Sequence, residues 1–178
     1  MTDQPTEPPV GAAPSGVPRL LALGLGFAVV LALVLGAFAV QAHRSVTQGE
    51  QRTSARDEAL RAARQEALNL TSVDATDIDG DLRRVQEGAT GDFAKDFTAQ
   101  STNLRKVLQD NAVQSVGEIK DAGVVALGDH NATVIVIANS TVKNKALPTG
   151  TPRTYRMRLE LSKGGDGQWK TAKLEFVG

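Results

Sequence analysis

The chain has 178 residues and a balanced charge, with 20 Lys plus Arg against 20 Asp plus Glu. A chain without a positive excess lacks the electrostatic footprint of a nucleic-acid-binding protein. It also contains no cysteine, which excludes disulfides, thiolate metal sites and cysteine nucleophiles.

Residues 1–19 form a proline-rich tail. This segment holds five of the seven prolines and no aromatic side chain. Its apolar surface is too small to offset the entropy lost when a chain becomes ordered, so we expect disorder. The spaced prolines also fit a ligand for a partner domain, but a plain tail is the simpler interpretation.

Residues 20–40 form an apolar run without a charged side chain. A helix rises about 1.5 Å per residue, so this run would extend about 31 Å, the thickness of a bilayer's hydrocarbon core. The alternative is a cleavable signal peptide, with Ala37 and Ala39 as small residues of a cleavage site. Its apolar region normally spans only about 7–15 residues. The sequence therefore predicts an uncleaved transmembrane helix.

The charges that flank the apolar run indicate its orientation only weakly. Arg19 precedes the run, whereas Arg44, Arg52 and Arg56 follow it. Positive residues normally lie on the cytoplasmic side, so this count alone places the C-terminal domain in the cytoplasm. Acidic residues are interleaved with these arginines, however, and whole domains translocate largely regardless of charge.

Small residues form a stripe along the predicted transmembrane helix, at Gly24, Ala28, Ala32 and Gly36. A spacing of four places them on one helix face, where a second helix can approach closely. The stripe is therefore a candidate helix-pairing surface. The alternative is composition alone, because Ala and Gly are frequent throughout the chain.

An Ala-rich amphipathic helix is predicted over residues 41–70, between the membrane and the main domain. Ser54–Asp57 resembles a capping box within it. Its apolar stripe recurs at helical spacing and consists of Ala55, Ala59, Ala62, Ala63, Ala67 and Leu70. Because these side chains are small, we expect this helix to pack closely on a neighbouring element.

Two further helices are predicted at the start of an α+β domain that spans residues 71–178. The first runs from Asp77 to Glu87, and Gly88 is expected to end it in a left-handed conformation. The second begins after Thr90, a favourable N-cap residue.

The hydrophobic period changes to two after about residue 112, which predicts strands. Four are expected, at residues 113–127, 131–142, 155–161 and 169–177. A shift in apolar phase between Trp169 and Ala172 predicts a β-bulge. Helices followed by an antiparallel meander indicate an α+β layer, with the helices on one face of a curved sheet. We expect Phe93 and Phe97 to meet one face of the strand 155–161 in a common core.

The sequence contains no catalytic pattern. His43 lies near the apolar run, and His130 lies beside Asp129 in a predicted turn, where adjacent side chains usually point apart. No phosphate-binding glycine loop and no nucleophile elbow is present. We therefore predict no catalytic residue, no cofactor and a protein that is not an enzyme.

Two charged sets are interpreted as structural. Asp77–Asp81 resembles the start of a calcium loop, but such a loop needs Gly at its sixth position and Glu at its twelfth, where this chain has Leu82 and Gly88. Negative charge at a helix N-terminus explains the carboxylates better, and no metal site is predicted. The basic set is interpreted as a solvated sheet face and comprises Arg153, Arg156, Arg158, Lys170 and Lys173.

The order of these parts resembles that of a known family. After the tail, the span and the Ala-rich helix come the run Leu70–Asp81, then Ala89-Thr-Gly-Asp-Phe93 with Phe97 one turn on, and finally Gly167-Gln-Trp169. Over about residues 20–178, the chain resembles the Mce-associated membrane proteins of actinobacteria.

The resemblance implies an accessory role. Such proteins accompany Mce systems, which are envelope complexes that import lipids with an ABC-type ATPase. It implies a cone-shaped, nuclear-transport-factor-like (SnoaL-like, cystatin-like) domain outside the cytoplasmic membrane, with the N-terminus inside. That orientation is opposite to the one given by the arginine count, and it is the one we expect. The family supplies no catalytic residues.

Three functions fit the sequence. The favoured one is a membrane-anchored, non-catalytic accessory or stabilising subunit of an Mce-type lipid-import complex, with Mce subunits or related membrane proteins as partners. The second is a single-pass scaffold subunit of a type IV-like secretion or conjugation system. The third is a lipid-binding cup or an enzyme, because cone-shaped folds often hold a pocket. No nucleic-acid partner is expected.

Overall fold

The computed structural model describes residues 49–178. The predicted tail, the predicted transmembrane helix and the stripe of Gly24, Ala28, Ala32 and Gly36 lie outside these residues. Within residues 49–178, no helix combines the length and the apolar character needed to cross a membrane. Residues Glu50–Gly178 form one compact unit.

A long helix opens the described chain and is followed from residue 49 to residue 71 (helix 49–71). After it come the two-residue strand β1 (Val73–Asp74) and the helices α2 (Ile78–Gly88) and α3 (Gly91–Asp110). The chain ends with the strands β2 (Gln114–Leu127), β3 (Asn131–Lys143), β4 (Thr151–Lys163) and β5 (Trp169–Phe176). The predicted order of helices followed by strands is confirmed.

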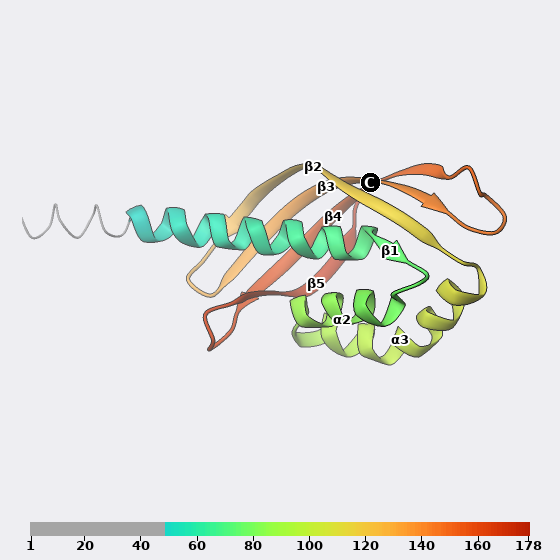
Figure 1. The fold of residues 1–178 in the computed structure, drawn as a ribbon. Helices are drawn as coiled ribbons and strands as arrows, with labels where there is room; N and C mark the ends of the chain where they lie inside the picture. Colours follow the sequence, from blue (N-terminus) through green and yellow to red (C-terminus); the bar gives the residue numbers. More distant parts are fainter. Residues whose placement is uncertain (1–48) are drawn as a thin grey trace, which may run out of the picture. The chain divides into compact units, whose positions relative to one another are not determined.

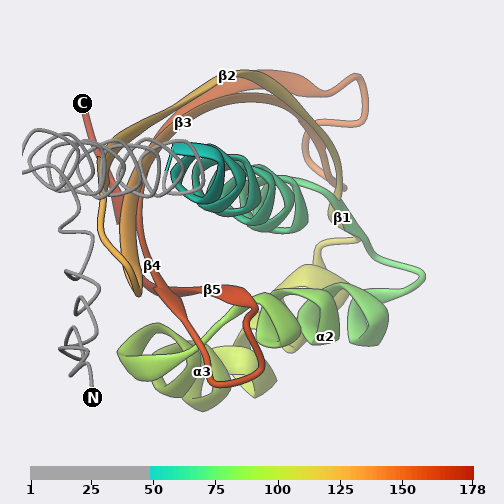
Figure 2. The ribbon, with the colours of Figure 1, turned by 90° about the vertical axis from the view of Figure 1, so that its left-hand side faces the viewer.

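The five strands form one antiparallel sheet in the order β1-β2-β3-β4-β5. The sheet curls around helix 49–71, which lies along its concave face (Figures 1 and 2). The predicted bulge is present, because Glu160 pairs with Lys173 while Leu161 pairs with Thr171, and Ala172 is the extra residue. Strand β1 was not predicted, since two residues are too few to show a period.

The core lies between helix 49–71 and the concave face of the sheet. On the helix, Ala59, Ala63 and Ala67 are fully buried. The facing side chains come from β3, β4 and β5 and include Val134, Val136, Met157, Leu159, Leu161 and Trp169. Small side chains let the helix backbone approach the sheet closely, so the predicted close packing of the Ala stripe is confirmed.

The prediction that Phe93 and Phe97 share a core with β4 is wrong. Helix α3 has no buried residue, and the two rings are half-buried with their centroids 6.0 Å apart. Helix α3 packs on α2 and β5 instead. The concave face of β3 and β4 is already covered by the Ala stripe of helix 49–71, so the two phenylalanines are left at the edge of the domain.

The junction between α2 and α3 attaches this helix pair to the sheet. Ala89 forms a parallel bridge with Thr171, and the Thr90 N–H donates to the Thr171 carbonyl oxygen at 2.8 Å. Thr90 is the N-cap residue of α3, as predicted, although its side chain makes no capping hydrogen bond. Gly91 has φ +57°, a conformation that favours glycine. The run Ala89–Phe93 therefore has a structural role.

Candidate functional site

Within residues 49–178, the residues weighed from sequence as catalytic or metal-binding take structural positions, and His43 lies outside these residues. His130 is exposed in the turn between β2 and β3. Asp81 is buried at the start of α2, where it accepts a hydrogen bond from the Asp74 N–H at 2.7 Å and pairs with Arg84. Within residues 49–178, no group of three or more acidic or histidine side chains is placed to hold a metal ion.

The basic set on the outer sheet face is interleaved with acids. Arg158 lies 3.5 Å from Glu160 and 4.0 Å from Glu175, and Lys173 lies 2.7 Å from Glu175. These ion pairs are exposed and contribute little to stability. The arrangement agrees with a solvated face and does not form a concentrated basic patch.

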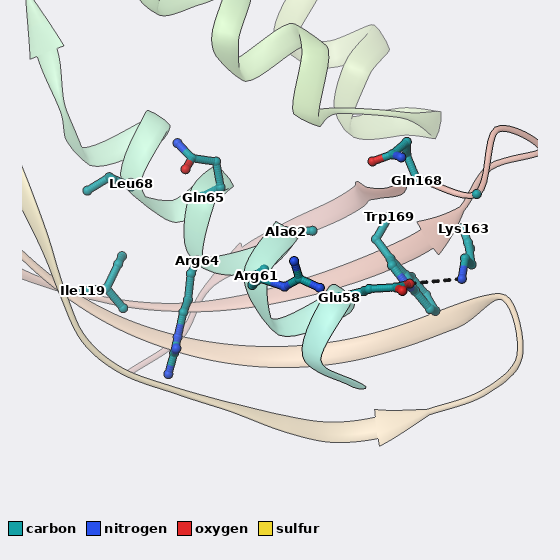
Figure 3. A pocket seen from close by; sticks show the side chains of 11 residues that line it. Glu58, Arg61, Ala62, Arg64, Gln65, Leu68, Ile119, Lys163, Gln168 and Trp169 are labelled. Atoms are coloured by element: carbon teal, nitrogen blue, oxygen red, sulfur yellow. Dashed lines mark hydrogen bonds and ion pairs between the residues drawn. The ribbon is translucent and has the colours of Figure 1, made fainter. Parts of the chain in front are cut away.

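A cavity of about 770 Å³ opens between helix 49–71 and the hairpin that joins β4 to β5 (Figure 3). The helix contributes charged, polar and apolar side chains between Glu58 and Leu68, and β2 contributes Ile119. Lys163, Gln168 and Trp169 line the hairpin side. Since the two walls are separated by about a hundred residues of chain, the site could not be assembled from local sequence patterns.

A neutral ion pair joins the two walls of the cavity. The Lys163 Nζ lies 3.2 Å from the Glu58 Oε2 and 5.5 Å from the centroid of the Trp169 ring. Ser54 donates to the other Glu58 oxygen at 3.2 Å. These hydrogen bonds, that from Lys163 above all, hold the pKa of Glu58 below its usual value.

Two arginines give the cavity its net charge. Arg61 and Arg64 are exposed, and neither has a carboxylate partner within residues 49–178; the Arg61 Nε donates only to the Asp57 carbonyl oxygen, at 3.3 Å. In Figure 3 the Arg61 side chain extends toward Glu58, whereas that of Arg64 extends away from it. With Glu58 neutralised by Lys163, the lining carries a net charge of +2.

A buried acid, Glu66, lies on the same helix next to the cavity residue Gln65. Glu66 is only 2% exposed; its Oε2 accepts a hydrogen bond from the Asn69 Nδ2 at 3.3 Å, and its Oε1 has no partner. Burial raises its pKa to about 7, against a lowering by the Asn69 hydrogen bond. The sequence interpretation missed Glu66, although its position seven residues after Ala59 places it on the buried face.

The contact between helix 49–71 and α2 depends on glycine at position 88. A Cβ there would overlap the Glu66 Oε2, so Gly88 provides the space for this carboxyl group. The predicted left-handed conformation of Gly88 is wrong, because Gly88 is the last residue of α2 and is not among the residues with positive φ. The absence of a side chain at position 88, and not the backbone freedom of glycine, explains why glycine occurs there.

Two further polar atoms, the Trp169 Nε1 and the Thr171 Oγ1, are buried without a hydrogen-bond partner. Both side chains are on β5, and Thr171 pairs with Ala89, which follows Gly88. Thr171 therefore lies where β5 meets the end of α2, whereas Trp169 lines the cavity beside Glu58 and Lys163. Because these atoms are sealed from solvent, a substrate cannot reach them in this conformation.

Sequence comparison shows that the chain is similar to a mycobacterial protein. Residues 20–178 match the family described as Uncharacterized protein Rv1363c/MT1408-like. The protein Rv1363c of Mycobacterium tuberculosis (strain ATCC 25618 / H37Rv) is 32% identical over 164 residues, which cover 90% of this chain and 61% of that protein. The chain thus spans less than two thirds of this relative's length. Neither description mentions an Mce system.

Comparison of folds finds solved structures that resemble this one in architecture. An IcmL-like type IV secretion system protein from Legionella pneumophila has a TM-score of 0.56 and 14% identity, over 68% of this chain and 91% of that one. A TraE protein has a TM-score of 0.51 and 14% identity, over 65% and 91%. An Ntf2-like protein involved in plasmid conjugation has a TM-score of 0.46 and 12% identity, over 68% and 48%. At such low identities, the first two structures show a shared fold alone.

Proposed function

Because the chain belongs to the Rv1363c/MT1408-like family, whose match includes the apolar run as well as the folded unit, we propose that it is a membrane-anchored, non-catalytic assembly subunit of a multi-protein envelope complex. The observation that carries this proposal is the position of helix 49–71. This helix is the centre of the domain's core, and only residues 41–48 separate it from the apolar run.

Helix 49–71 is held within the folded unit by several contacts. Three alanines of helix 49–71 are fully buried against the sheet. At the end of the helix, the Thr71 carbonyl oxygen accepts hydrogen bonds from the hydroxyls of Ser115 and Ser140, both at 2.9 Å. The helix that follows the apolar run in sequence is therefore fixed to the sheet along its length and at its end. Such a domain suits the holding of partner proteins at a membrane.

The kind of complex is supported by the shared fold. An IcmL-like type IV secretion system protein and a TraE protein share this fold. We therefore place a scaffold of a secretion- or conjugation-like assembly first.

The Mce-type lipid-import complex is the second candidate. It is favoured by the sequence runs that resemble Mce-associated proteins. The most specific of these runs, Ala89–Phe93, is accounted for by its contact with β5. It therefore supports a common fold more directly than a common partner.

The burial of Glu66 supports a non-catalytic role. A catalytic acid or base must come within hydrogen-bond distance of the reacting group. Glu66 is 2% exposed, and Asn69 is the side chain that hydrogen-bonds to it. In this arrangement, Glu66 contributes to the contact between two helices and is closed to a substrate.

For the orientation, we propose that the N-terminus is cytoplasmic and the folded unit extracytoplasmic, as the resemblance implies. A C-terminal tag on the full chain should become sensitive to protease once the outer envelope of whole cells is removed. A tag that stays protected while an extracytoplasmic control protein is digested would place the domain in the cytoplasm and overturn this part of the proposal.

The function itself is tested by crosslinking the full chain in its native membrane, followed by purification and mass spectrometry. Recovery of secretion or conjugation subunits would support the first candidate, and recovery of Mce subunits the second. Recovery of no other envelope protein, under conditions where a known complex from the same membrane is recovered intact, would refute an assembly role.

A further inference from the structure

We propose that the cavity between helix 49–71 and the β4–β5 hairpin binds a phosphate-bearing ligand, with Arg61 as the residue that contacts the phosphate. This inference goes beyond the proposed assembly role and does not depend on it. It rests on the size of the cavity, its unpaired positive charge and the aromatic wall beside that charge.

The cavity has the dimensions of a ligand site. Its volume of about 770 Å³ lies within the range of about 300–1,000 Å³ that is usual for small-molecule pockets. Ala62 is a half-buried wall residue, and its small side chain leaves this space open. The adjacent Ala63 is fully buried against the sheet, so the core fixes the position of the wall.

The charge of the cavity selects an anion. Glu58 is neutralised by Lys163, whereas Arg61 and Arg64 have no carboxylate partner within residues 49–178. A guanidinium group binds phosphate through two parallel hydrogen bonds and is less strongly hydrated than an ammonium group. Arg61 extends into the region of Glu58 and Trp169, so it can make direct contact. Arg64 extends away from this region and contributes through the local potential.

The remaining lining fits an organic phosphate better than a bare ion. Gln168 presents an amide on the hairpin side, which can donate to a phosphate oxygen. Trp169 is 6% exposed, and this small apolar surface lines the cavity next to the charged region. A free phosphate ester and a phospholipid headgroup share this chemistry.

The test uses the full chain in a nonionic detergent, with fluorescence of Trp169 as the signal because it is the chain's single tryptophan. The probes are inorganic phosphate, dihexanoyl-phosphatidylglycerol and dihexanoylglycerol, which lacks phosphate. A saturable change with inorganic phosphate and the phospholipid would indicate a site for soluble phosphate compounds. A change with the phospholipid alone would indicate a lipid headgroup. No saturable change with either, or an equal change with dihexanoylglycerol, would overturn the proposal.

Charge variants separate recognition from general attraction. Arg61→Gln should weaken binding of the probe by about tenfold or more, since a charge-assisted contact is lost. Arg64→Gln should weaken it less, and added salt should reduce the effect of Arg64 more than that of Arg61. Arg83→Gln is the matched control, because Arg83 is exposed on α2 outside the cavity. Equal affinities for the Arg61 and Arg83 variants would refute the assignment.

Discussion

Glu66 gives the sharpest prediction, because a buried carboxyl group couples stability to pH. Glu66→Gln keeps the shape of the side chain and removes its ability to ionise. The carboxyl group has a folded-state pKa of about 7, raised from 4.5 by burial. The folded protein therefore holds this proton more tightly than the unfolded chain does. The stabilisation is complete below about pH 4.5 and is lost as the pH rises through 7.

The magnitude follows from the two pKa values. The interval from 4.5 to about 7, at about 1.4 kcal/mol per pH unit, corresponds to about 3 kcal/mol in the free energy of unfolding. Because Glu66 is only 2% exposed, screening by solvent reduces this figure little. At pH 8.5 the Glu66→Gln variant should therefore be more stable than the natural chain by about 2–3 kcal/mol. At pH 4.5 the two should differ by less than about 1 kcal/mol.

The assay is urea unfolding of the full chain at a series of pH values from 4.5 to 8.5. With a slope of about 2 kcal/mol per molar urea, the gain at pH 8.5 would move the midpoint upward by about 1 M or more. Glu87→Gln, at an exposed position on α2, is the matched control and should follow the natural chain throughout. If Glu66→Gln shows the same pH dependence as the natural chain, the placement of a protonated, buried carboxyl group is wrong.

Three further changes test the contacts that define the domain. Gly88→Ala should destabilise the folded unit by about 1–3 kcal/mol, although alanine is the better helix former, because the new Cβ meets the Glu66 carboxyl group. Thermal unfolding should show that adding Glu66→Ala relieves this loss. Additive effects of the two changes would contradict the contact. Ala63→Leu should cost about 1–3 kcal/mol or more, since its position is fully buried against the sheet, and a neutral result in chemical denaturation would mean that the helix does not pack as described. The double change Ala28→Ile and Ala32→Ile should reduce co-purification of membrane partners, as judged by quantitative mass spectrometry; unchanged recovery would argue that the small-residue stripe reflects composition.

Much of the domain could be predicted from sequence, because its elements bury one face at a regular period. The Ala stripe at 59, 63 and 67 predicted both the helix and its close packing. The phase change before Ala172 predicted the bulge in β5. Such signals are local, since a helix repeats its buried face every 3.6 residues and a strand every two.

The placement of α3 and the contents of the site could not be predicted in the same way. The apolar face of α3 carries two phenylalanines, and by size alone it was the stronger candidate to fill the sheet. Its exclusion depends on which helix approaches the concave face most closely, which is a competition among distant segments. The burial of Glu66 could not be predicted for a related reason. Its position on the buried helix face follows from the sequence, but its carboxyl group fits there only because Gly88, on another helix, has no side chain.

The sequence alone determined that an apolar run of membrane length precedes an Ala-rich helix and an antiparallel meander, because hydrophobic length and period act within one segment. Only the tertiary structure decided that this helix is the centre of the sheet's concave face and that Glu58 and Arg61 meet Lys163 and Trp169 around a cavity. These outcomes depend on close packing between segments about a hundred residues apart. The shape of the packing surfaces, and not the periodicity of the sequence, determines which of several apolar helix faces packs against the sheet.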